Sequence, residues 1–560
     1  MLWDLSYILE NSYRIALGDL PYRDFPFPYP PLTFLTQALL IRFTGRVFWH
    51  HIAYCAIAGG LATILTWRIL VHSLRDAVPW PRALAFGLSL PLIVLGIYCV
   101  YPHPFYDPDC TMAILLGVFM LQRVDRHSSS AFTSLLAGAT LAVPLFVKQN
   151  AGLPFIGSSG LAVLVLAIVA LWRQRSVKKH ALILVGVVAA VALAATLIHF
   201  TVGLKNYWYW TITFAAARRT PARGDMMAIY TDKTVVISSL IVIAGLIAFW
   251  VSRRGSRVLS ASGLLLMAIP FCWPTIYLLR ESDSSERAER LLTLWPVTIC
   301  LCLIVAILSI RRRMGASLVL PFILIATING VFMSQQLWGS TYAIWPLFMI
   351  LISSSLAGLN SLSSKSTPSR QSSQSNSVRL LFLLTGLIVL SLLIAGGFYV
   401  KSHERLDYAN LDDGALTHSS LPALKGLATR GDWLPNFEEL VEYAEREIPR
   451  DQGILILPGE DLFYYATGRR PQFPVLMFDH TINPYSPEEI LQLARDRQIN
   501  WVIVKQDLQD EDEEPEKMRD QITEALEREF EQVESLNNYD IYRRGQPDNP
   551  SDSDDDDGKP

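Results

Sequence analysis

Five carboxylates lie at positions where acid–base chemistry could take place. Asp4 lies in the run WDLSY, Glu10 follows it by a turn and a half of helix, and Asp24 lies in a proline-rich stretch. Asp107 and Asp109 lie in HPFYDPDC, where an apolar segment begins. One such carboxylate could act as a general base while others position an acceptor or a metal ion. The alternative for each is a helix N-cap or a solvated loop acid, and Asp109 fits a cap well.

Basic residues interleaved with aromatic residues form a second candidate group. The segment GLKNYWYWTITFAAARRTPARGD (203–225) carries Lys205, Arg218 and Arg219 close to the aromatic run YWYW. Guanidinium groups bind phosphate through paired hydrogen bonds, and aromatic residues favour the membrane interface. This segment could therefore hold a lipid-linked phosphate. The alternative is an ordinary aromatic belt with snorkelling arginines.

Three further basic residues are candidates for binding phosphate. Lys148, in FVKQNAG, stands between two apolar segments with hardly any loop to solvate it. An ionisable residue at such depth indicates a function, and snorkelling to the interface is the alternative. Arg280 and Arg287 lie in LLRESDSSERAER, a polar segment that separates two other apolar segments.

The elements that must position these residues are membrane helices. Of the 560 residues, 51% are hydrophobic and 18% are charged, and the mean hydropathy is +0.30. Soluble domains carry more charge, so the composition indicates an integral membrane protein. The net charge of −3 gives no reason to expect nucleic acid as a partner. The six cysteines fall in or beside apolar segments and lack CxxC pairs or histidine partners at ligand spacing, so neither a disulfide framework nor a zinc site is expected.

Apolar segments of spanning length recur along the first 400 residues. A spanning helix needs ~20 mostly apolar residues, and about twelve segments approach this criterion. They lie roughly at 48–72, 82–101, 109–122, 131–147, 151–171, 181–202, 234–251, 258–279, 291–310, 316–334, 340–358 and 378–400.

Basic residues between the spans predict which loops face the cytoplasm. Runs such as WRQRSVKK (172–179) and SRRGSR (252–257) lie in alternate loops, which we expect to be cytoplasmic. Residues 1–47, the segment 203–233 and everything after residue 400 are then extracytoplasmic. Because the first loop lies outside, we expect a thirteenth helix upstream of Met1 in the full product. The alternative is that Met1–Leu17 forms an amphipathic helix, which the neighbouring helices carry across the membrane.

The stretch GDLPYRDFPFPYPPLTF (18–34) is predicted to be a shaped loop. Its five prolines forbid a regular helix, and an irregular backbone belongs in water or against protein. Tyr22, Arg23 and Asp24 in this loop are candidates for substrate contact.

The pattern of apolar and polar residues changes after Tyr399. FEELVEYAEREI, SPEEILQLARDR and EKMRDQITEALEREFEQV have helical spacing, whereas GILILP, PVLMF and NWVIV are typical of short buried strands. This alternation predicts a small α/β domain. The predicted organisation is a first extracytoplasmic loop (1–47), a transmembrane helical domain (48–400), an extracytoplasmic α/β domain (401–545) and a disordered acidic tail (546–560).

Three motifs occur in a familiar order. They are WD…Y…GDLPYRDF…PPL…G over residues 3–45, FYDPD at 105–109 and LFVKQNAGL at 145–153, and they are followed by the C-terminal run FEELVEYAEREIPRDQGILILPGEDLFYYATGRRP. This order resembles the bacterial GT-C glycosyltransferases, the broad group that contains glycosyltransferase family 39, protein O-mannosyltransferases and aminoarabinose transferases. The resemblance covers most of the chain, but its loosely spaced motifs do not specify a substrate.

The resemblance implies an activity and a location. It implies inverting transfer of a hexosyl or pentosyl group from a polyprenyl-phosphate donor to a glycan, lipid or protein acceptor. The reaction would take place at the outer face of the bacterial plasma (inner) membrane, among membrane lipids. A divalent cation, Mg²⁺ or Mn²⁺, is the one cofactor that this chemistry suggests.

The resemblance also implies residue roles. Asp4 matches the family's catalytic base by its position ahead of the PYRDF run, and Asp107 or Asp109 matches the acid that opens the second outer loop. Leu5 follows Asp4 where the family often has a second acid, which argues against a metal-binding pair there. Glu10 and Asp24 join Asp107 and Asp109 as candidates for positioning the acceptor or a metal. The candidates for binding the donor phosphate are Lys148, Lys205, Arg218, Arg219, Arg280 and Arg287.

Other classes of protein remain open. A polytopic transporter or flippase of lipid-linked sugar would often show repeated halves and helices broken near the midplane, and no such repeat is visible. An O-antigen polymerase or ligase would also use lipid-linked sugar but seldom ends in an α/β domain of this length. A catalytically silent relative would bind lipid or carbohydrate through the C-terminal domain. Release of lipid phosphate from a donor separates an enzyme from the transporter and the silent relative.

Overall fold

The computed structural model describes eleven ranges of the chain, which divide into two compact units. The ranges are 2–99, 102–126, 130–220, 222–252, 256–280, 294–313, 315–332, 343–363, 371–400, 415–508 and 513–545. The unit that we call the membrane unit comprises Pro28–Thr36 and His50–Asp407. The unit that we call the α/β unit comprises Met1–Phe27, Gln37–Trp49 and Tyr408–Pro560.

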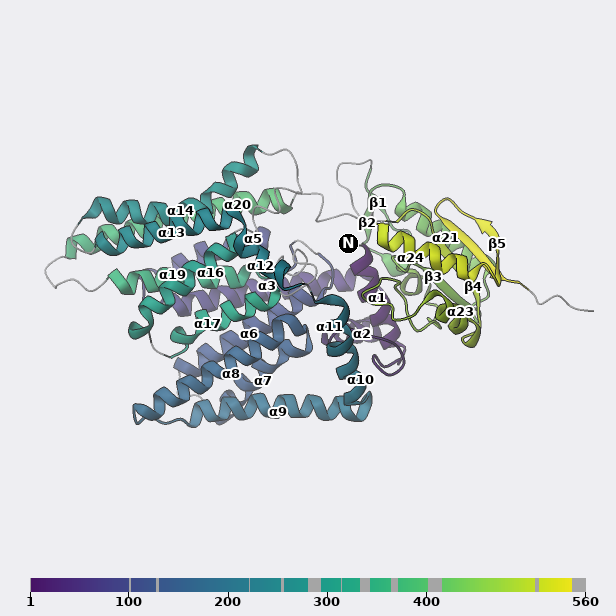
Figure 1. The fold of residues 1–560 in the computed structure, drawn as a ribbon, viewed down its shortest axis with the longest axis horizontal. Helices are drawn as coiled ribbons and strands as arrows, with labels where there is room; N and C mark the ends of the chain where they lie inside the picture. The colour runs from purple at the N-terminus through teal and green to yellow at the C-terminus, as the bar shows by residue number, and fades with distance from the viewer. Residues whose placement is uncertain are drawn as a thin grey trace, which may run out of the picture. The chain divides into compact units, whose positions relative to one another are not determined.

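The membrane unit consists of helices (Figure 1). Six helices of the described residues are long and apolar enough to cross a membrane, and five shorter apolar helices accompany them. The bounds of the longer elements are α3 (Phe48–Leu74), α4 (Pro81–Ser89), α6 (Tyr106–Arg126), α7 (Ala131–Ala142), α8 (Gln149–Trp172), α9 (Lys178–Thr201), α13 (Lys233–Val251), α14 (Arg257–Arg280), α16 (Leu294–Ser309), α17 (Ala316–Val331), α19 (Trp345–Ser363) and α20 (Gln371–Val400). This architecture confirms the prediction of a helical unit with several helices of spanning length, and the count of about twelve spans stays a prediction.

One predicted span is wrong as a single helix. The segment 82–101 contains α4, which ends at Ser89, and α5 (Leu92–Leu95), which has only four residues. Pro91 precedes α5 and has no N–H group to continue the hydrogen-bond ladder of α4. The apolar composition of this segment is therefore distributed over two short helices.

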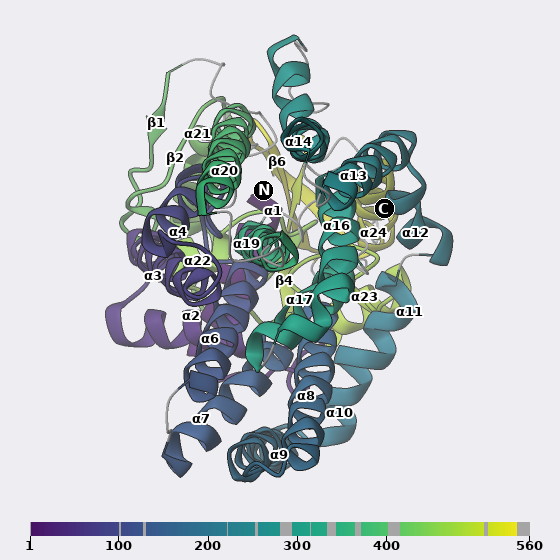
Figure 2. The same ribbon diagram turned by 90° about the vertical axis from the view of Figure 1, so that its left-hand side faces the viewer.

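Glycines bring pairs of membrane helices into backbone contact. A Cβ atom added at Gly138 of α7 would lie 2.0 Å from the carbonyl oxygen of Ile183 in α9, and one at Gly186 would lie 2.2 Å from the carbonyl oxygen of Leu135. Small residues allow the backbones of two helices to approach this closely. Such packing matters in a membrane, because lipid provides no hydrophobic driving force for helices to associate. In Figure 2, where α9, α19 and α20 are seen nearly end-on, α8 lies beside α9.

The α/β unit contains a four-stranded sheet. Its strands are β3 (Gly453–Leu457), β4 (Ile499–Lys505), β5 (Phe530–Ser535) and β6 (Tyr539–Arg544), in the order β3-β4-β6-β5. β3 and β4 run parallel with Leu457 opposite Val504, and β6 lies antiparallel to both β4 and β5. The helices are α1 (Leu2–Ala16), α21 (Trp433–Glu447), α22 (Phe463–Thr467), α23 (Pro487–Asp496) and α24 (Glu513–Leu526), and two residues each form β1 (Thr417–His418) and β2 (Ala428–Thr429). The alternation of strands and helices predicted after residue 400 is confirmed.

Two details of this prediction are wrong. PVLMF (474–478) forms no strand, although Val475 and Phe478 are buried in the core that also holds Leu455, Val502 and Ile490. The helix predicted to continue through FEQV ends at Leu526, and Phe530–Ser535 forms β5 instead. Burial alone therefore does not imply a strand, and the edge strand β5 lacks the apolar run that marks β3 and β4.

Helix α1 is an integral part of the α/β unit. The Ser6 hydroxyl donates to the carbonyl oxygen of Asp461 at 2.8 Å, and the Arg14 guanidinium donates to the carbonyl oxygens of Phe473 and Pro474 at 3.1 and 2.9 Å. The sequence predicted residues 1–47 as an extracytoplasmic loop, and a helix over Met1–Leu17 was the alternative to a further helix upstream of Met1. The structure has a helix at Leu2–Ala16. The proline-rich stretch that follows is irregular, as predicted. α2 (Leu32–Thr44) then spans the boundary between the two units.

Glu10 makes the stability of the α/β unit dependent on pH. Burial raises the pKa of Glu10 to about 8, although the N–H group of Tyr465, which donates to Oε1 at 3.0 Å, acts in the opposite direction. Folded Glu10 thus keeps its proton to about pH 8, whereas an unfolded glutamate loses its proton near 4.5. The free energy of unfolding should fall as pH rises through this interval, by up to about 1.4 kcal/mol per pH unit.

The Glu10→Gln variant tests this dependence. Glutamine keeps an acceptor for the Tyr465 N–H group and has no proton to lose, so we expect a smaller fall in stability between pH 5 and pH 8. Urea unfolding of the purified full chain, followed by the fluorescence of the α/β unit, measures it, with exposed Glu531→Gln as the matched control. Equal pH slopes in the wild type and Glu10→Gln would show that Glu10 is ionised in the folded protein.

Candidate functional site

A buried ion pair joins the beginning of α6 to the junction before α8. The Lys148 ammonium donates to Asp107 Oδ1, and the two residues are 8% and 5% exposed. The Lys148 Nζ atom also lies 4.9 Å from the centre of the Tyr106 ring. Asp107 is the second residue of α6, and Lys148 is the N-cap of α8. The sequence predicted that both residues contribute to a site, and the structure brings them together.

Asp109 accepts hydrogen bonds from three hydroxyl groups, which lie in three other segments of the membrane unit. Oδ1 accepts hydrogen bonds from the Tyr54 and Tyr98 hydroxyls at 2.7 and 2.5 Å, and Oδ2 accepts one from the Thr33 hydroxyl at 2.8 Å. Asp109 is the fourth residue of α6, so it does not precede the helix. The alternative of a helix N-cap is therefore wrong for Asp109. Its carboxylate instead ties the proline-rich stretch to α3 and α6.

Removing one hydroxyl donor should destabilise the membrane unit. Hydrogen bonds to charged groups contribute about 1.5–3 kcal/mol, so Tyr98→Phe should lower the free energy of unfolding by roughly that amount. Thermal unfolding in detergent measures the loss, with Tyr209→Phe, an exposed tyrosine, as the control for removing a hydroxyl. A Tyr98→Phe protein as stable as the control would show that the Asp109 contacts contribute nothing.

Gln149 connects two more of the predicted segments. Its side-chain amide donates to the carbonyl oxygen of Pro28 at 3.3 Å and to that of Thr211 at 3.1 Å. Thr211 lies in the π-helix Tyr209–Phe214, within the segment that carries the interleaved aromatic and basic residues. Residues 28–34 of the proline-rich stretch, the beginning of α6, the Lys148–Gln149 junction and this π-helix thus meet in one polar cluster, which we call the loop junction.

The remaining basic candidates lie in the segments 203–219 and 280–287. Lys205 in α10 (Leu204–Trp208) is exposed, and Arg218 in α11 (Ala215–Arg219) is exposed with its guanidinium 4.8 Å from the centre of the Phe214 ring. Arg219 and Arg280 end α11 and α14, but their side chains and the whole of Arg287 lie outside the described residues. The structure therefore does not place these guanidinium groups in the junction.

The other three predicted acids belong to the α/β unit. Asp4 is half-buried in the first turn of α1, and Glu10, six residues later, is buried. Asp24 accepts a hydrogen bond from the Leu20 N–H group at 2.8 Å and pairs with the Arg23 guanidinium at 2.8 Å, so it closes a turn of the proline-rich stretch. These contacts give Glu10 and Asp24 structural roles.

A third charged group was not predicted from the sequence. Lys505 Nζ donates to Glu460 Oε2 at 2.8 Å and to Asp461 Oδ1 at 3.2 Å, and all three residues are buried. The Asp461 carboxylate also accepts hydrogen bonds from the Trp433 indole and the Tyr539 hydroxyl at 2.8 and 3.0 Å. Burial lowers the pKa of Lys505, but the charges of Asp461 and Glu460 outweigh it and raise the pKa overall. The signal in the sequence is a lysine that ends the apolar strand NWVIVK.

The side chains of the loop junction do not form a metal site. Asp107 binds an ammonium group, and Asp109 accepts from three hydroxyls. Within the described ranges no group of three or more His, Cys, Asp or Glu side chains is placed to hold a metal ion.

Comparison with known proteins finds similarity only among solved structures. No protein-family model and no curated protein matches the chain. ArnT from Cupriavidus metallidurans in the apo state aligns with a TM-score of 0.47 and 10% identity, over 96% of this chain and 93% of that chain. ArnT bound to undecaprenyl phosphate aligns over the same shares with a TM-score of 0.41 and 12% identity.

The Archaeoglobus fulgidus oligosaccharyltransferase in complex with Zn and sulfate aligns with a TM-score of 0.46 and 11% identity, over 90% of this chain and 64% of that chain. ArnT and this oligosaccharyltransferase are both GT-C glycosyltransferases. Identities of 10–12% leave the roles of individual residues to be argued from the contacts of this chain.

Proposed function

We propose that this protein is a GT-C-type membrane glycosyltransferase that moves a sugar from a polyprenyl-phosphate donor to a glycan, lipid or protein acceptor. The observation that carries the proposal is the loop junction, where four segments singled out by their motifs meet around Asp107, Asp109, Lys148 and Gln149. Buried ionisable residues are costly among membrane helices and mark functional sites. We place this junction at the outer face of the bacterial plasma membrane, and the α/β unit outside the cell membrane.

The residues support an inverting displacement. Asp4 acts as the general base that removes the acceptor proton while the acceptor attacks the anomeric carbon and lipid phosphate departs. Negative charge develops on the departing phosphate, and fixed positive charges stabilise it. Lys148, held by Asp107, provides such a charge at the junction. Lys205 and Arg218 are exposed candidates for the same role, and Arg219, Arg280 and Arg287 keep that role as predictions.

Asp107 and Asp109 position groups for this reaction. Asp107 fixes the Lys148 ammonium, and Asp109 holds the proline-rich stretch against α3 and α6 through its three hydroxyl partners. Holding reacting groups in place contributes much of the rate enhancement of transfer enzymes. The junction therefore serves both to bind the donor and to shape the loop that receives the acceptor.

Donor turnover tests the proposed function. The purified full chain in lipid vesicles is incubated with a panel of radiolabelled hexosyl and pentosyl polyprenyl phosphates, and released polyprenyl phosphate is separated by chromatography. We expect release from at least one donor when membrane extract is added as the source of acceptor. Movement of intact donor across the vesicle membrane without release would instead indicate a transporter or flippase.

A further inference from the structure

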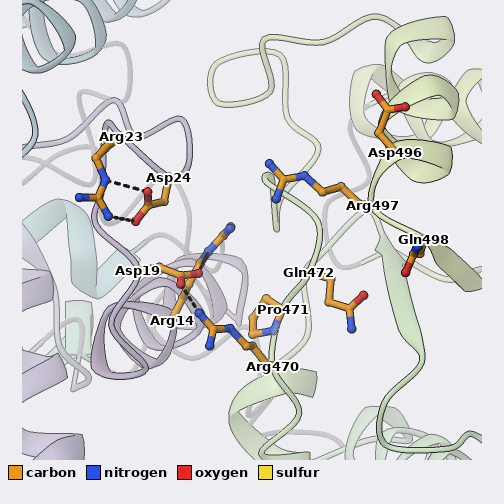
Figure 3. Close-up of a pocket in the computed structure, with 10 residues that line it drawn as sticks. All are labelled: Arg14, Asp19, Arg23, Asp24, Arg470, Pro471, Gln472, Asp496, Arg497 and Gln498. Atoms are coloured by element: carbon orange, nitrogen blue, oxygen red, sulfur yellow. Dashed lines mark hydrogen bonds and ion pairs between the residues drawn. The ribbon is translucent and has the colours of Figure 1, made fainter.

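A polar pocket lies within the α/β unit, between the beginning of the chain and two loops of the C-terminal domain (Figure 3). Its volume is about 590 Å³, and four arginines, three aspartates, two glutamines and one proline line it. It shares no residue with the loop junction, because none of its residues belongs to the membrane unit. Its size suits a small ligand, since ligand pockets usually measure about 300–1,000 Å³.

Two of the three carboxylates of the pocket are already paired with arginines. Asp19 accepts hydrogen bonds from Arg14 at 2.8 Å and from Arg470 at 2.6 Å, so one carboxylate serves two guanidinium groups. Asp24 binds Arg23 through two parallel hydrogen bonds of 2.8 and 2.9 Å. These pairs leave the pocket with more positive than negative charge.

Arg497 supplies the positive charge that is available to a ligand. Its side chain extends into the pocket, whereas the neighbouring Asp496 carboxylate points away from it (Figure 3). The Arg497 guanidinium has no ion-pair or hydrogen-bond partner within the described residues. Arg14 is only 3% exposed and lies 4.4 Å from the centre of the Phe25 ring, so its charge is fixed in the wall of the pocket.

We infer that this pocket binds a saccharide that carries a carboxylate or a phosphate. Arg497 and Arg470 would hold the anionic group, because guanidinium groups bind both carboxylate and phosphate through paired hydrogen bonds. The amides of Gln472 and Gln498 line the same pocket and both donate and accept, as sugar hydroxyls require. A free phosphate ion would leave most of the volume to water. The proposal that this saccharide is part of the acceptor rests on the proposed function. The proposal that the pocket binds such a saccharide does not.

Binding of small charged sugars to the purified full chain tests the inference. Glucuronate, glucose 1-phosphate, glucose and inorganic phosphate are titrated in detergent solution, and binding is followed by saturation-transfer NMR. We expect the two charged sugars to bind more tightly than glucose and inorganic phosphate, and to weaken as the salt concentration rises. Arg497→Gln should weaken the binding of the charged sugars by about tenfold or more. Arg528→Gln removes an exposed arginine outside the pocket and is the matched control.

Three outcomes would overturn the inference. Equal binding of glucose and glucuronate would show that charge is not recognised, and inorganic phosphate that binds as tightly as glucose 1-phosphate would show that the sugar is not. Wild-type affinity in Arg497→Gln would place any charged-sugar binding elsewhere. Because no donor is present, these results are independent of donor turnover, which alone decides the proposed function.

Discussion

The Asp4→Asn variant is expected to lose sugar transfer by a factor of roughly 10²–10⁴, the usual contribution of a positioned general base. Asparagine has nearly the same shape as aspartate but cannot take the acceptor proton. Donor binding should persist, because Asp4 is not a member of the loop junction. Single-turnover transfer from a radiolabelled donor, measured beside equilibrium donor binding, separates the two effects.

The position of Asp4 makes this variant interpretable. Asp4 is half-buried in the first turn of α1, where a helix favours negative charge by about 0.3–1 kcal/mol. Loss of this small term should leave the protein folded and inserted, which limited proteolysis and thermal unfolding can verify. Glu531→Gln removes an exposed carboxylate of the same unit and should retain wild-type transfer. Wild-type transfer by Asp4→Asn would contradict the assignment of the base.

Breaking the Asp107–Lys148 pair should produce the largest loss of stability. Removing one partner of a buried ion pair leaves an uncompensated charge and typically costs about 3–5 kcal/mol. Lys148→Met and Asp107→Leu should each destabilise the membrane unit by roughly this amount, because both residues are less than one-tenth exposed. Thermal unfolding of each variant in detergent measures the loss.

The double variant Asp107→Leu/Lys148→Met separates stability from function. It leaves no unpaired charge, so its stability should be higher than that of either single variant. We expect it to be folded and still inactive in transfer, because the positive charge for the donor phosphate is gone. Full transfer by the stable double variant would show that the pair has only a structural role. Single variants as stable as the wild type would show that the two groups are not paired as described.

Sequence patterns predicted helices and strands more reliably than they predicted contacts between side chains. The apolar strands GILIL and NWVIV and the capped helix at Pro487–Asp496 were recognisable because propensity, burial and capping agree there. The segment 82–101 misled because hydropathy counts apolar residues and does not register the break before Pro91. PVLMF misled because buried irregular segments have the same composition as buried strands.

The candidate site was predictable in part for the same reason. Lys148 stood out because a charge between two apolar segments is costly, and its partner Asp107 was already a candidate. The hydroxyls of Thr33, Tyr54 and Tyr98 gave no signal, since their role depends on contacts with Asp109 from distant points of the chain. Burial of Glu10 and the pairing of Asp24 with Arg23 likewise follow from packing and turn geometry.

The most direct test of the proposed activity is the stoichiometry of one reaction in a defined system. Wild-type protein in sealed vesicles receives a polyprenyl phosphate with radiolabel in both the sugar and the lipid, together with membrane extract as acceptor. We expect one polyprenyl phosphate released for each sugar transferred, and neither product with Asp4→Asn. Sugar that crosses the membrane while still attached to its lipid, or donor that stays intact with every sugar tested, would contradict this expectation.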